Sequence, residues 1–420
     1  MDQAEFEQLW ATAHAGAASA QETLADVFAS AGKAEQARQW LVRAVAAARP
    51  SAVTRLGLWE ITGFGGPSDL ERGLGRILAC AQSGDAEAAH TAAILFCGGV
   101  GAPRDRAQGL RWLVRATELG HVRATAQLGL LVGAQSNAGA NLLRIAGAKG
   151  SVVAMYALGR AHPQRDEAAF WTRHAVDAGH PLAKGVATAG ETPRLEQVLE
   201  PRWTALVDAV DYAWVDVACN RRLQMQQPHI ELLDDFLPLD VCEYVIGMAA
   251  PMLSRGKVVD TQGDESVSEE RSNAVMNFGL ADSDFVLELI NNKTARAVEL
   301  PPENAEGLGV LHYRTGDSYT PHVDYLADTP ENSAQLAARG QRVTTLLVYL
   351  NQDFDGGETA FPRLDVSFKP PAGSALIFHN VDAQARTDPH TLHTGRPPTQ
   401  GEKWLISKWF RSKALRPGAG

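Results

Sequence analysis

Residues 313–324 read YRTGDSYTPHVD and end on the pair His322-Val-Asp324. Side chains two positions apart on a β-strand point to the same face of a sheet, so this pair can hold one metal ion from a single rigid element. A third ligand must come from another part of the chain. We predict His393 for this role, at the end of the segment DPHTLH, residues 388–393.

Two histidines and one carboxylate occupy one triangular face of an octahedron and leave the opposite three positions open, as in non-haem Fe(II) oxygenases. The chemistry needs these open positions, because 2-oxoglutarate takes two of them and O2 takes the third. We therefore predict a catalytic Fe(II) held by His322, Asp324 and His393. His379 and His390 are the alternatives for the third ligand.

The far carboxylate of 2-oxoglutarate needs a cation, and Lys403 follows His393 by ten residues (403 − 393). This lysine stands between a glycine turn and the apolar run that begins at Trp404, so its side chain is predicted to point inward. The spacing to Lys403 favours His393 over His390 as the third ligand.

Short apolar segments with glycine and proline between them surround these residues and read as β-strands. They are GLGVLHY at 307–313, RVTTLLVYLN at 342–351, SALIFHN at 374–380 and KWLISKWF at 403–410. The segment 342–351 is β-branched and apolar enough for a central strand. A short strand at 229–237 and an amphipathic helix at 238–252 precede them. Many short strands after a helical half predict a separate β-rich domain, a sandwich or a barrel.

Three blocks of this half resemble the prolyl 4-hydroxylase family of 2-oxoglutarate oxygenases, over about residues 228–412. They are YRTGDSYTPHVD at 313–324, LLVYLNQDFDGGETAFP at 346–362 and DPHTLHTGRPPTQGEKW at 388–404. The resemblance implies a double-stranded β-helix, or jelly roll, with L-ascorbate as a supporting cofactor. It also implies hydroxylation of a peptidyl or prolyl substrate.

Carried over by position, the resemblance supports the three iron ligands and the lysine anchor named above. It implies that Tyr313 hydrogen-bonds the same carboxylate of 2-oxoglutarate and that Thr359 lies near the cofactor. Arg342 and Trp409 match positions near the substrate channel. The stretch from 327 to 340 corresponds to a variable lid that meets the substrate.

Residues 1–185 are rich in alanine, have helical spacing of apolar positions and contain a repeat. Asp69-Leu-Glu-Arg-Gly-Leu matches Asp105-Arg-Ala-Gln-Gly-Leu at an offset of 36, and the same offset relates Gly63 to Gly99. Segments that end helices recur at Arg49, Gly84, Gly120, Gly150 and Gly179. A period near 35 with two helical segments per unit predicts an α-solenoid of helical hairpins.

The stretch 86–121, AEAAHTAAILFCGGVGAPRDRAQGLRWLVRATELGH, resembles Sel1-like repeats, which are relatives of the tetratricopeptide repeat. The resemblance implies a scaffold that binds other proteins and has no chemistry of its own. The glycines at 98, 99 and 101 have an alternative reading as a phosphate-binding loop, which requires a strand before them. We expect a turn between two helices instead.

The composition narrows the partners and the compartment. The formal net charge of −10 argues against nucleic acid or an anionic membrane as the main partner. Four cysteines without a C-x-x-C pair indicate a reducing compartment. The N-terminus lacks the features of a secretory signal, and no apolar run reaches the roughly 18 residues of a membrane span. These observations predict a cytoplasmic protein.

The sequence thus predicts a helical solenoid at 1–185, a linker with a connecting helix at 186–227 and an oxygenase domain at 228–412. We expect hydroxylation of a protein or peptide that docks through the repeats. Two alternatives stay open at this point. One is a hydroxylase of a small molecule, and the other is a degenerate oxygenase fold that serves as a binding scaffold.

Overall fold

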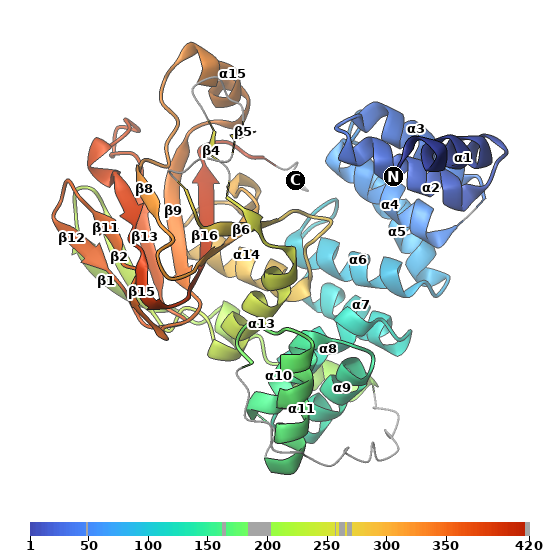
Figure 1. The fold of residues 1–420 in the computed structure, drawn as a ribbon, viewed down its shortest axis with the longest axis horizontal. Coiled ribbons are helices and arrows are strands. Elements are labelled where there is room, and N and C mark those ends of the chain that lie inside the picture. Colours follow the sequence, from blue (N-terminus) through green and yellow to red (C-terminus); the bar gives the residue numbers. More distant parts are fainter. Residues whose placement is uncertain are drawn as a thin grey trace. The chain divides into compact units, whose positions relative to one another are not determined.

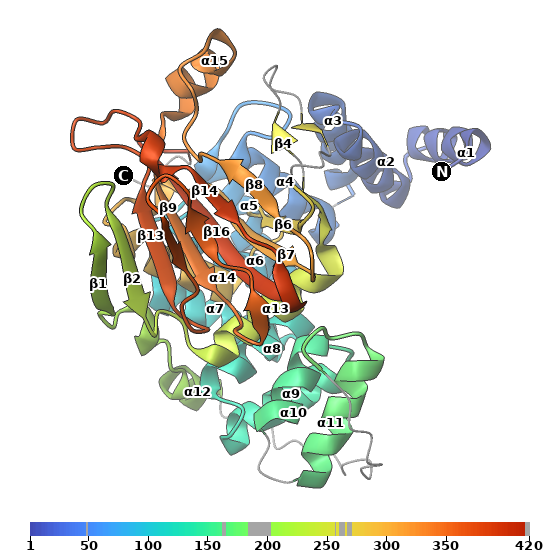
Figure 2. The same ribbon diagram turned by 60° about the vertical axis from the view of Figure 1, so that its left-hand side comes forward.

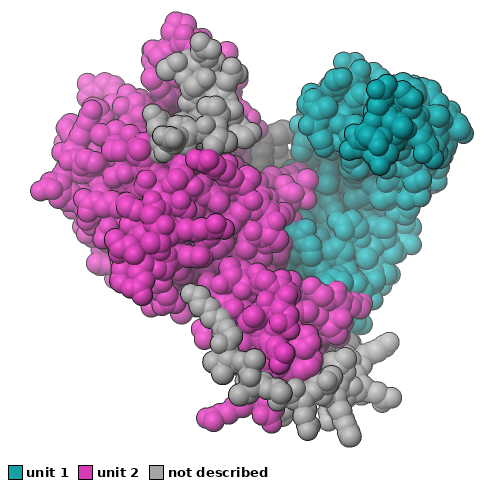
Figure 3. Space-filling view, in the orientation of Figure 1, with its two compact units in different colours: residues 1–128, 201–209, 416–420 teal, residues 129–200, 210–415 magenta. Residues whose placement is uncertain are grey.

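The computed structural model describes residues 1–47, 49–161, 165–183, 203–256, 258–259, 265–266 and 271–415. Two compact units, coloured separately in Figure 3, comprise residues 1–128, 201–209 and 416–420 in unit 1 and residues 129–200 and 210–415 in unit 2. The predicted boundaries at 185 and 228 differ from this division and stay predictions. Residues 186–202 of the predicted linker lie outside the described part of the chain.

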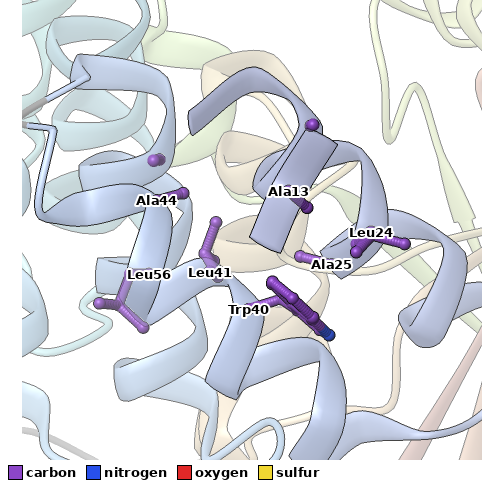
Figure 4. Packing of buried hydrophobic residues seen from close by; sticks show 9 residues of the cluster. Ala13, Leu24, Ala25, Trp40, Leu41, Ala44 and Leu56 are labelled. Carbon is purple, nitrogen blue, oxygen red and sulfur yellow. The ribbon is translucent and has the colours of Figure 1, made fainter. Parts of the chain in front are cut away.

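Unit 1 is built of helical hairpins. Its helices are α1 (Gln3–His14), α2 (Ala18–Ser30), α3 (Ala34–Val45), α4 (Pro50–Thr62), α5 (Leu70–Gln82), α6 (Ala86–Gly98), α7 (Arg106–Glu118), the first part of α8 (Val122–Val132) and the short α12 (Trp203–Ala209). The chain pairs α2 with α3, α4 with α5 and α6 with α7 (Figure 1). Trp40 of α3 packs with Leu24, Ala13 and their neighbours in a small apolar core (Figure 4). The predicted solenoid is confirmed.

The offset of 36 residues in the sequence is a repeat of helix caps. Asp69 and Asp105 are the N-caps of α5 and α7, and each carboxylate accepts a hydrogen bond from the backbone N–H three residues later. Gly63 and Gly99 end α4 and α6 with the same left-handed φ of 72°. Because α6 precedes Gly99, the glycine-rich stretch is a turn between helices, as expected.

Unit 2 contains the end of the helical array together with the predicted oxygenase domain. Its helices are α9 (Asn137–Ala148), α10 (Val152–Ala161), α11 (Arg165–Asp177), η1 (Ala213–Val215), α13 (Leu239–Ala249), η2 (Ala250–Met252), α14 (Phe285–Ala297), η3 (Pro302–Asn304), α15 (Pro330–Arg339) and η4 (Pro389–Thr391). Helix α10 packs against α13. The predicted lid at 327–340 contains α15.

The strands of unit 2 are antiparallel wherever they pair. They are β1 (Asn220–Met225), β2 (Ile230–Asp234), β3 (Ser254–Arg255), β4 (Val258–Val259), β5 (Glu265–Ser266), β6 (Ala274–Phe278), β7 (Leu308–Tyr313), β8 (Tyr319–His322), β9 (Arg342–Tyr349), β10 (Phe354–Gly356), β11 (Thr359–Phe361), β12 (Val366–Phe368), β13 (Ala375–His379), β14 (His393–Gly395), β15 (Pro398–Gly401) and β16 (Lys403–Arg411).

Two sheets face each other as in a jelly roll (Figure 2). The large sheet has the order β1-β2-β13-β9-β16-β7-β6-β3, and the small sheet has the order β12-β11-β14-β8. Phe361 of the small sheet packs with Leu347 and Phe378 of the large sheet, so the core lies between them. As predicted, the β-branched β9 is a central strand. Among the described residues, no helix is both long enough and apolar enough to cross a membrane.

Helices α4 and α5 cross closely at Gly57 and Gly73. Gly75, on the same helix as Gly73, provides a matched control. A Cβ on Gly73 would overlap the carbonyl oxygen of Gly57, whereas a Cβ on Gly75 of the same helix meets no atom within 4 Å. Gly73→Ala should therefore lower the free energy of unfolding by about 1–3 kcal/mol. Gly75→Ala should stabilise the helix by up to about 1 kcal/mol. Urea unfolding measures both, and equal effects would contradict the close crossing.

Candidate active site

Three predicted ligands meet at the pairing of two strands of the small sheet. β14 places His393 directly opposite His322 of β8, with 4.3 Å between the ring centroids. Asp324 follows the end of β8. Its Oδ1 lies 3.8 Å from Nε2 of His322, and its Oδ2 lies 3.6 Å from Nε2 of His393. One ligand atom from each of the three residues falls within 4.8 Å of the others, so the structure brings the trio together.

Hydrogen bonds set the orientation of both imidazoles. Nδ1 of His322 donates to the carbonyl oxygen of Thr320 (2.8 Å), and Nδ1 of His393 donates to that of Thr391 (3.0 Å). In the neutral form of either ring, Nε2 then carries the lone pair that is directed at the common centre. Burial, together with the neighbouring His393, lowers the pKa of His322 to about 3, so this ring is neutral at physiological pH.

The carboxylate of Asp324 is oriented by a strand of the opposite sheet. Thr345 of β9 donates a hydrogen bond of 2.7 Å to Oδ2, and Thr345 itself accepts one of 3.0 Å from the side-chain amide of Asn380. Burial raises the pKa of Asp324, but His393, His322 and Thr345 together hold that pKa below its ordinary value. The acid is therefore ionised and fixed in rotation.

Lys403 is the first residue of β16 and lies opposite Tyr313 of β7. Its side chain is fully buried, and its Nζ has no hydrogen-bond partner among the described residues. Nζ lies 5.1 Å and 5.2 Å from the ring centroids of Tyr313 and Tyr349. Burial lowers the pKa of Lys403 to about 7. An unpaired buried ammonium is costly, so this position favours an anionic ligand.

The backbone on both sides of Lys403 is held by one side chain. Asn351 donates from Nδ2 to the carbonyl oxygen of Glu402 (2.8 Å) and accepts at Oδ1 from the N–H of Trp404 (2.9 Å). A register shift in the β10–β15 pair puts Gly357 against the lysine, where a Cβ would lie 3.4 Å from Cδ of Lys403. The extra residue of this β-bulge is Thr399 on β15, because Asp355 pairs with Gln400 and Gly356 pairs with Pro398.

The other predicted site residues fall into two groups. Tyr313, Thr359 and Trp409 line the same cavity as the three ligands and Lys403. Arg342 does not line it. Its guanidinium makes two hydrogen bonds to Glu306, at 2.7 Å and 2.9 Å, and stacks 3.7 Å from the ring centroid of Trp409. Arg342 therefore supports Trp409 from outside the cavity.

The rejected alternatives for the third ligand lie elsewhere. His390 is exposed, and its Nδ1 lies 2.9 Å from Oδ1 of Asp388. His379 of β13 stacks on His229 with 4.5 Å between the rings. Neither belongs to the ligand cluster of the described residues.

Sequence reasoning missed three residues of the site. Arg271 is buried, lines the cavity and stacks 4.7 Å from the ring centroid of Tyr319, but its segment carries no motif. Ser407 lines the cavity with Lys403 and Leu405 of the same strand. Because alternate residues of a strand share one face, the position of Lys403 could have predicted Ser407. Thr345 shares a face of β9 with the cavity residue Leu347, and the same rule applies.

Comparisons with known proteins agree with this geometry. The model of the 2OG-Fe(II) oxygenase superfamily matches residues 308–411. Prolyl 4-hydroxylase 1 of Arabidopsis thaliana is 35% identical over 202 residues, which cover 44% of this chain and 70% of that protein. The chain belongs to the 2OG-Fe(II) oxygenase superfamily. It is a 2-oxoglutarate-dependent dioxygenase, and its family implies Fe(II), 2-oxoglutarate and O2.

Two solved structures are each similar to part of this chain. A viral collagen prolyl hydroxylase from Paramecium Bursaria Chlorella virus-1, in a 2OG complex, is 26% identical and covers 44% of this chain and 96% of its own, with a TM-score of 0.34. A Sel1 repeat protein from Oxalobacter formigenes is 21% identical and covers 46% of this chain and 88% of its own, with a TM-score of 0.36.

The residues of the oxygenase fit the groups that the family implies. A divalent metal requires neutral imidazoles and an ionised carboxylate, which are the ligand types that His322, His393 and Asp324 supply. The partnerless Nζ of Lys403 suits the far carboxylate of 2-oxoglutarate. Fe(II) and 2-oxoglutarate therefore match the donor atoms present.

A second cluster in unit 1, formed by Glu87, His90 and His121, does not fit a metal in the same way. Nδ1 of His121 accepts the N–H of Ala124 (3.1 Å), so the proton of the neutral ring is on Nε2. Nε2 donates that proton to Glu87 (3.0 Å). The nitrogen of His121 that faces the cluster therefore has no free lone pair for a metal. The hydrogen bond between His121 and Glu87 instead links the start of α8 to α6.

The two neighbouring histidines offer a test of the metal centre. His393→Ala should lose tight Fe(II) binding and 2-oxoglutarate turnover, because it removes one of the three converging ligand atoms. His390→Ala should retain both. Anaerobic Fe(II) titration and succinate formation measure the effects, and circular dichroism checks that each variant keeps its fold. Normal turnover in His393→Ala would refute the assignment.

Lys403 makes stability depend on pH in the ligand-free protein. Its folded pKa of about 7 lies below its ordinary value of 10.5, so between these values the unfolded chain binds more protons. The free energy of unfolding from this group therefore rises with pH across the window, by up to about 1.4 kcal/mol per pH unit. Lys403→Met should flatten this rise, while Lys149→Met, at an exposed lysine in unit 2, should not.

The same substitution tests the anchor. Lys403→Met should weaken the affinity for 2-oxoglutarate by roughly 30- to 5,000-fold, which corresponds to about 2–5 kcal/mol for a buried charge left without its partner. The KM for 2-oxoglutarate and urea unfolding at several pH values measure the two effects. An unchanged KM together with an unchanged pH slope would assign the anchor to another residue.

Proposed function

We propose that this oxygenase hydroxylates a polypeptide, with prolyl residues as the first candidates. A C–H bond of the substrate becomes C–OH, while 2-oxoglutarate and O2 become succinate and CO2. The observation that carries the proposal is the convergence of His322, Asp324 and His393 beside the buried, partnerless Nζ of Lys403.

Each residue has a distinct part in the proposed site. His322, Asp324 and His393 would hold Fe(II) and act as the catalytic centre. When bound, the iron and its cosubstrate supply the oxidising power for hydroxylation. Lys403 would pair with the far carboxylate of 2-oxoglutarate, and ascorbate would keep the iron reduced.

The walls of the cavity would orient the cosubstrate and the substrate. Tyr313 would donate a hydrogen bond to the carboxylate that Lys403 holds. Thr359 lies on the same side, with its hydroxyl 2.7 Å from that of Tyr349. Trp409, supported by Arg342, would form part of the substrate channel and exclude water from the reacting atoms.

The class of substrate is inferred from the relatives and from the repeats. Several relatives are named prolyl 4-hydroxylases, and a helical solenoid supplies the kind of extended surface that proteins use to bind partners. We therefore propose that the repeats recruit the substrate or a partner. The cytoplasmic location remains a prediction.

Mass spectrometry tests the proposal directly. Polypeptides are first captured on protein whose metal site holds an ion that does not support turnover. The purified protein with Fe(II), 2-oxoglutarate and ascorbate should then add the mass of one oxygen atom to these polypeptides. The variant His322→Ala should add none. Iron-dependent succinate formation without a modified polypeptide would favour a small-molecule hydroxylase. Absence of both would favour a binding scaffold.

Docking through the repeats predicts a preference for intact partners. Tethering raises the local concentration of the target segment and can strengthen engagement by about 10²–10⁴ without any new contact at the iron. The kcat/KM for an intact partner should therefore exceed that for the peptide excised around its modified residue by a factor in this range. Equal efficiencies would assign the repeats to assembly instead.

A further inference from the structure

A second cavity, of about 370 Å³, lies inside unit 2 between helix α10 of the helical array and the oxygenase sheets. Tyr156 and Arg160 of α10 form one wall, Glu243 of α13 forms another, and Asn351 and Asp353 after β9 form a third. Its volume is in the range of ligand pockets, roughly 300–1,000 Å³. Repeat and oxygenase residues both line it.

The cavity is separate from the active site although one segment borders both. Lys403, Leu405 and Ser407 line the active-site cavity, whereas Glu402 and Trp404 line the second one. This division follows from the alternation of side chains along β16. No residue lines both cavities.

Charge in the second cavity is negative. Its described lining contains three carboxylates, Glu243, Asp353 and Glu402, and one guanidinium, Arg160. Arg160 pairs with Glu243 at 3.1 Å and offsets one carboxylate. Glu402 accepts from His312 (3.0 Å), and burial lowers the pKa of His312, so this ring adds no charge at neutral pH. Asp353 has no ion pair among the described residues. Two negative charges therefore remain.

Part of the remaining lining is apolar, beside the polar side chains of Tyr156, Asn351 and Gln352. Trp404 and Leu350 are buried, and Leu182 and Pro181 contribute further carbon surface. Leu239 is 57% exposed although it is a large apolar side chain. An occupant that matches both features has an apolar stem and a positively charged end. Arginine and lysine side chains have this form, because their methylene chains cover apolar surface while the charged group reaches acidic partners.

We propose that this cavity binds the arginine or lysine side chain of a polypeptide partner. The inference rests on the proposed function for the polypeptide nature of that partner. The carboxylates reject acidic peptides and nucleic-acid phosphates by like-charge repulsion. The site takes one basic side chain of the partner at the junction of repeats and catalytic domain, and so fixes which segment lies near the iron.

Two aspartates allow a local contact in the cavity to be distinguished from long-range electrostatic attraction. Both are exposed, but Asp353 lines the cavity and Asp355, two residues later on β10, does not. Asp353→Lys and Asp355→Lys change the net charge of the protein equally. Long-range attraction for a cationic peptide therefore changes equally in both variants, and only a local contact distinguishes them.

The experiment measures fluorescence anisotropy with the full chain and two labelled peptides. One peptide carries a single central arginine as its only charged group, and the other has citrulline, the uncharged near-isostere of arginine, at that position. The wild type should bind the arginine peptide about tenfold more tightly, and added salt should weaken this preference. Asp353→Lys should remove the preference, and Asp355→Lys should keep it.

Three results would overturn the proposal. They are equal binding of the two peptides by the wild type, equal losses in both variants, and no binding of the arginine peptide at millimolar concentration. The assay requires no turnover. A failure of the proposed hydroxylation would leave charge-selective binding in place, and a failure of the cavity would leave hydroxylation in place, so the two are distinguishable.

Discussion

The antiparallel pairing of β14 with β8 places His393 opposite His322, and a slip of one residue would turn one imidazole to the other face of the small sheet. The carboxylate ligand, Asp324, depends on the large sheet, because Thr345 of β9 orients it. Phe378 of the large sheet packs 4.8 Å from the ring of His393. The ligand geometry therefore requires the register of one pair of strands and a fixed spacing between the sheets.

The same two sheets hold Lys403 in a position that lowers the stability of the ligand-free fold. A fully buried ammonium without a partner is unfavourable in the ligand-free fold. The residue stays in place because Asn351 holds the peptide groups on both sides of it. The anchor is thus pre-organised, and 2-oxoglutarate need not order it on binding.

Much of this was predictable from local rules. The offset between Asp69 and Asp105 predicts equivalent caps, and the spacing from His322 to Lys403 predicts the ligands and the anchor before any contact is known. Contacts between distant segments were not predictable in this way. Nothing in the sequence indicates that Arg342 would stack outside the cavity on Trp409, because that position depends on Glu306 in another segment. Arg271 was not predictable either, because its place in the site depends on Tyr319 in another segment.

The grouping of the last hairpins with the oxygenase has a physical cause that no repeat pattern contains. Tyr156 and Arg160 of α10 both reach Glu243 of α13, at 3.3 Å and 3.1 Å. At Gly247 of α13, a Cβ would come within 2.7 Å of Val153, so the two helices approach as closely as a glycine allows. A repeat that contacts the catalytic domain in this way has a fixed position relative to that domain. A partner held there is held relative to the iron site, which a flexible tether would not achieve.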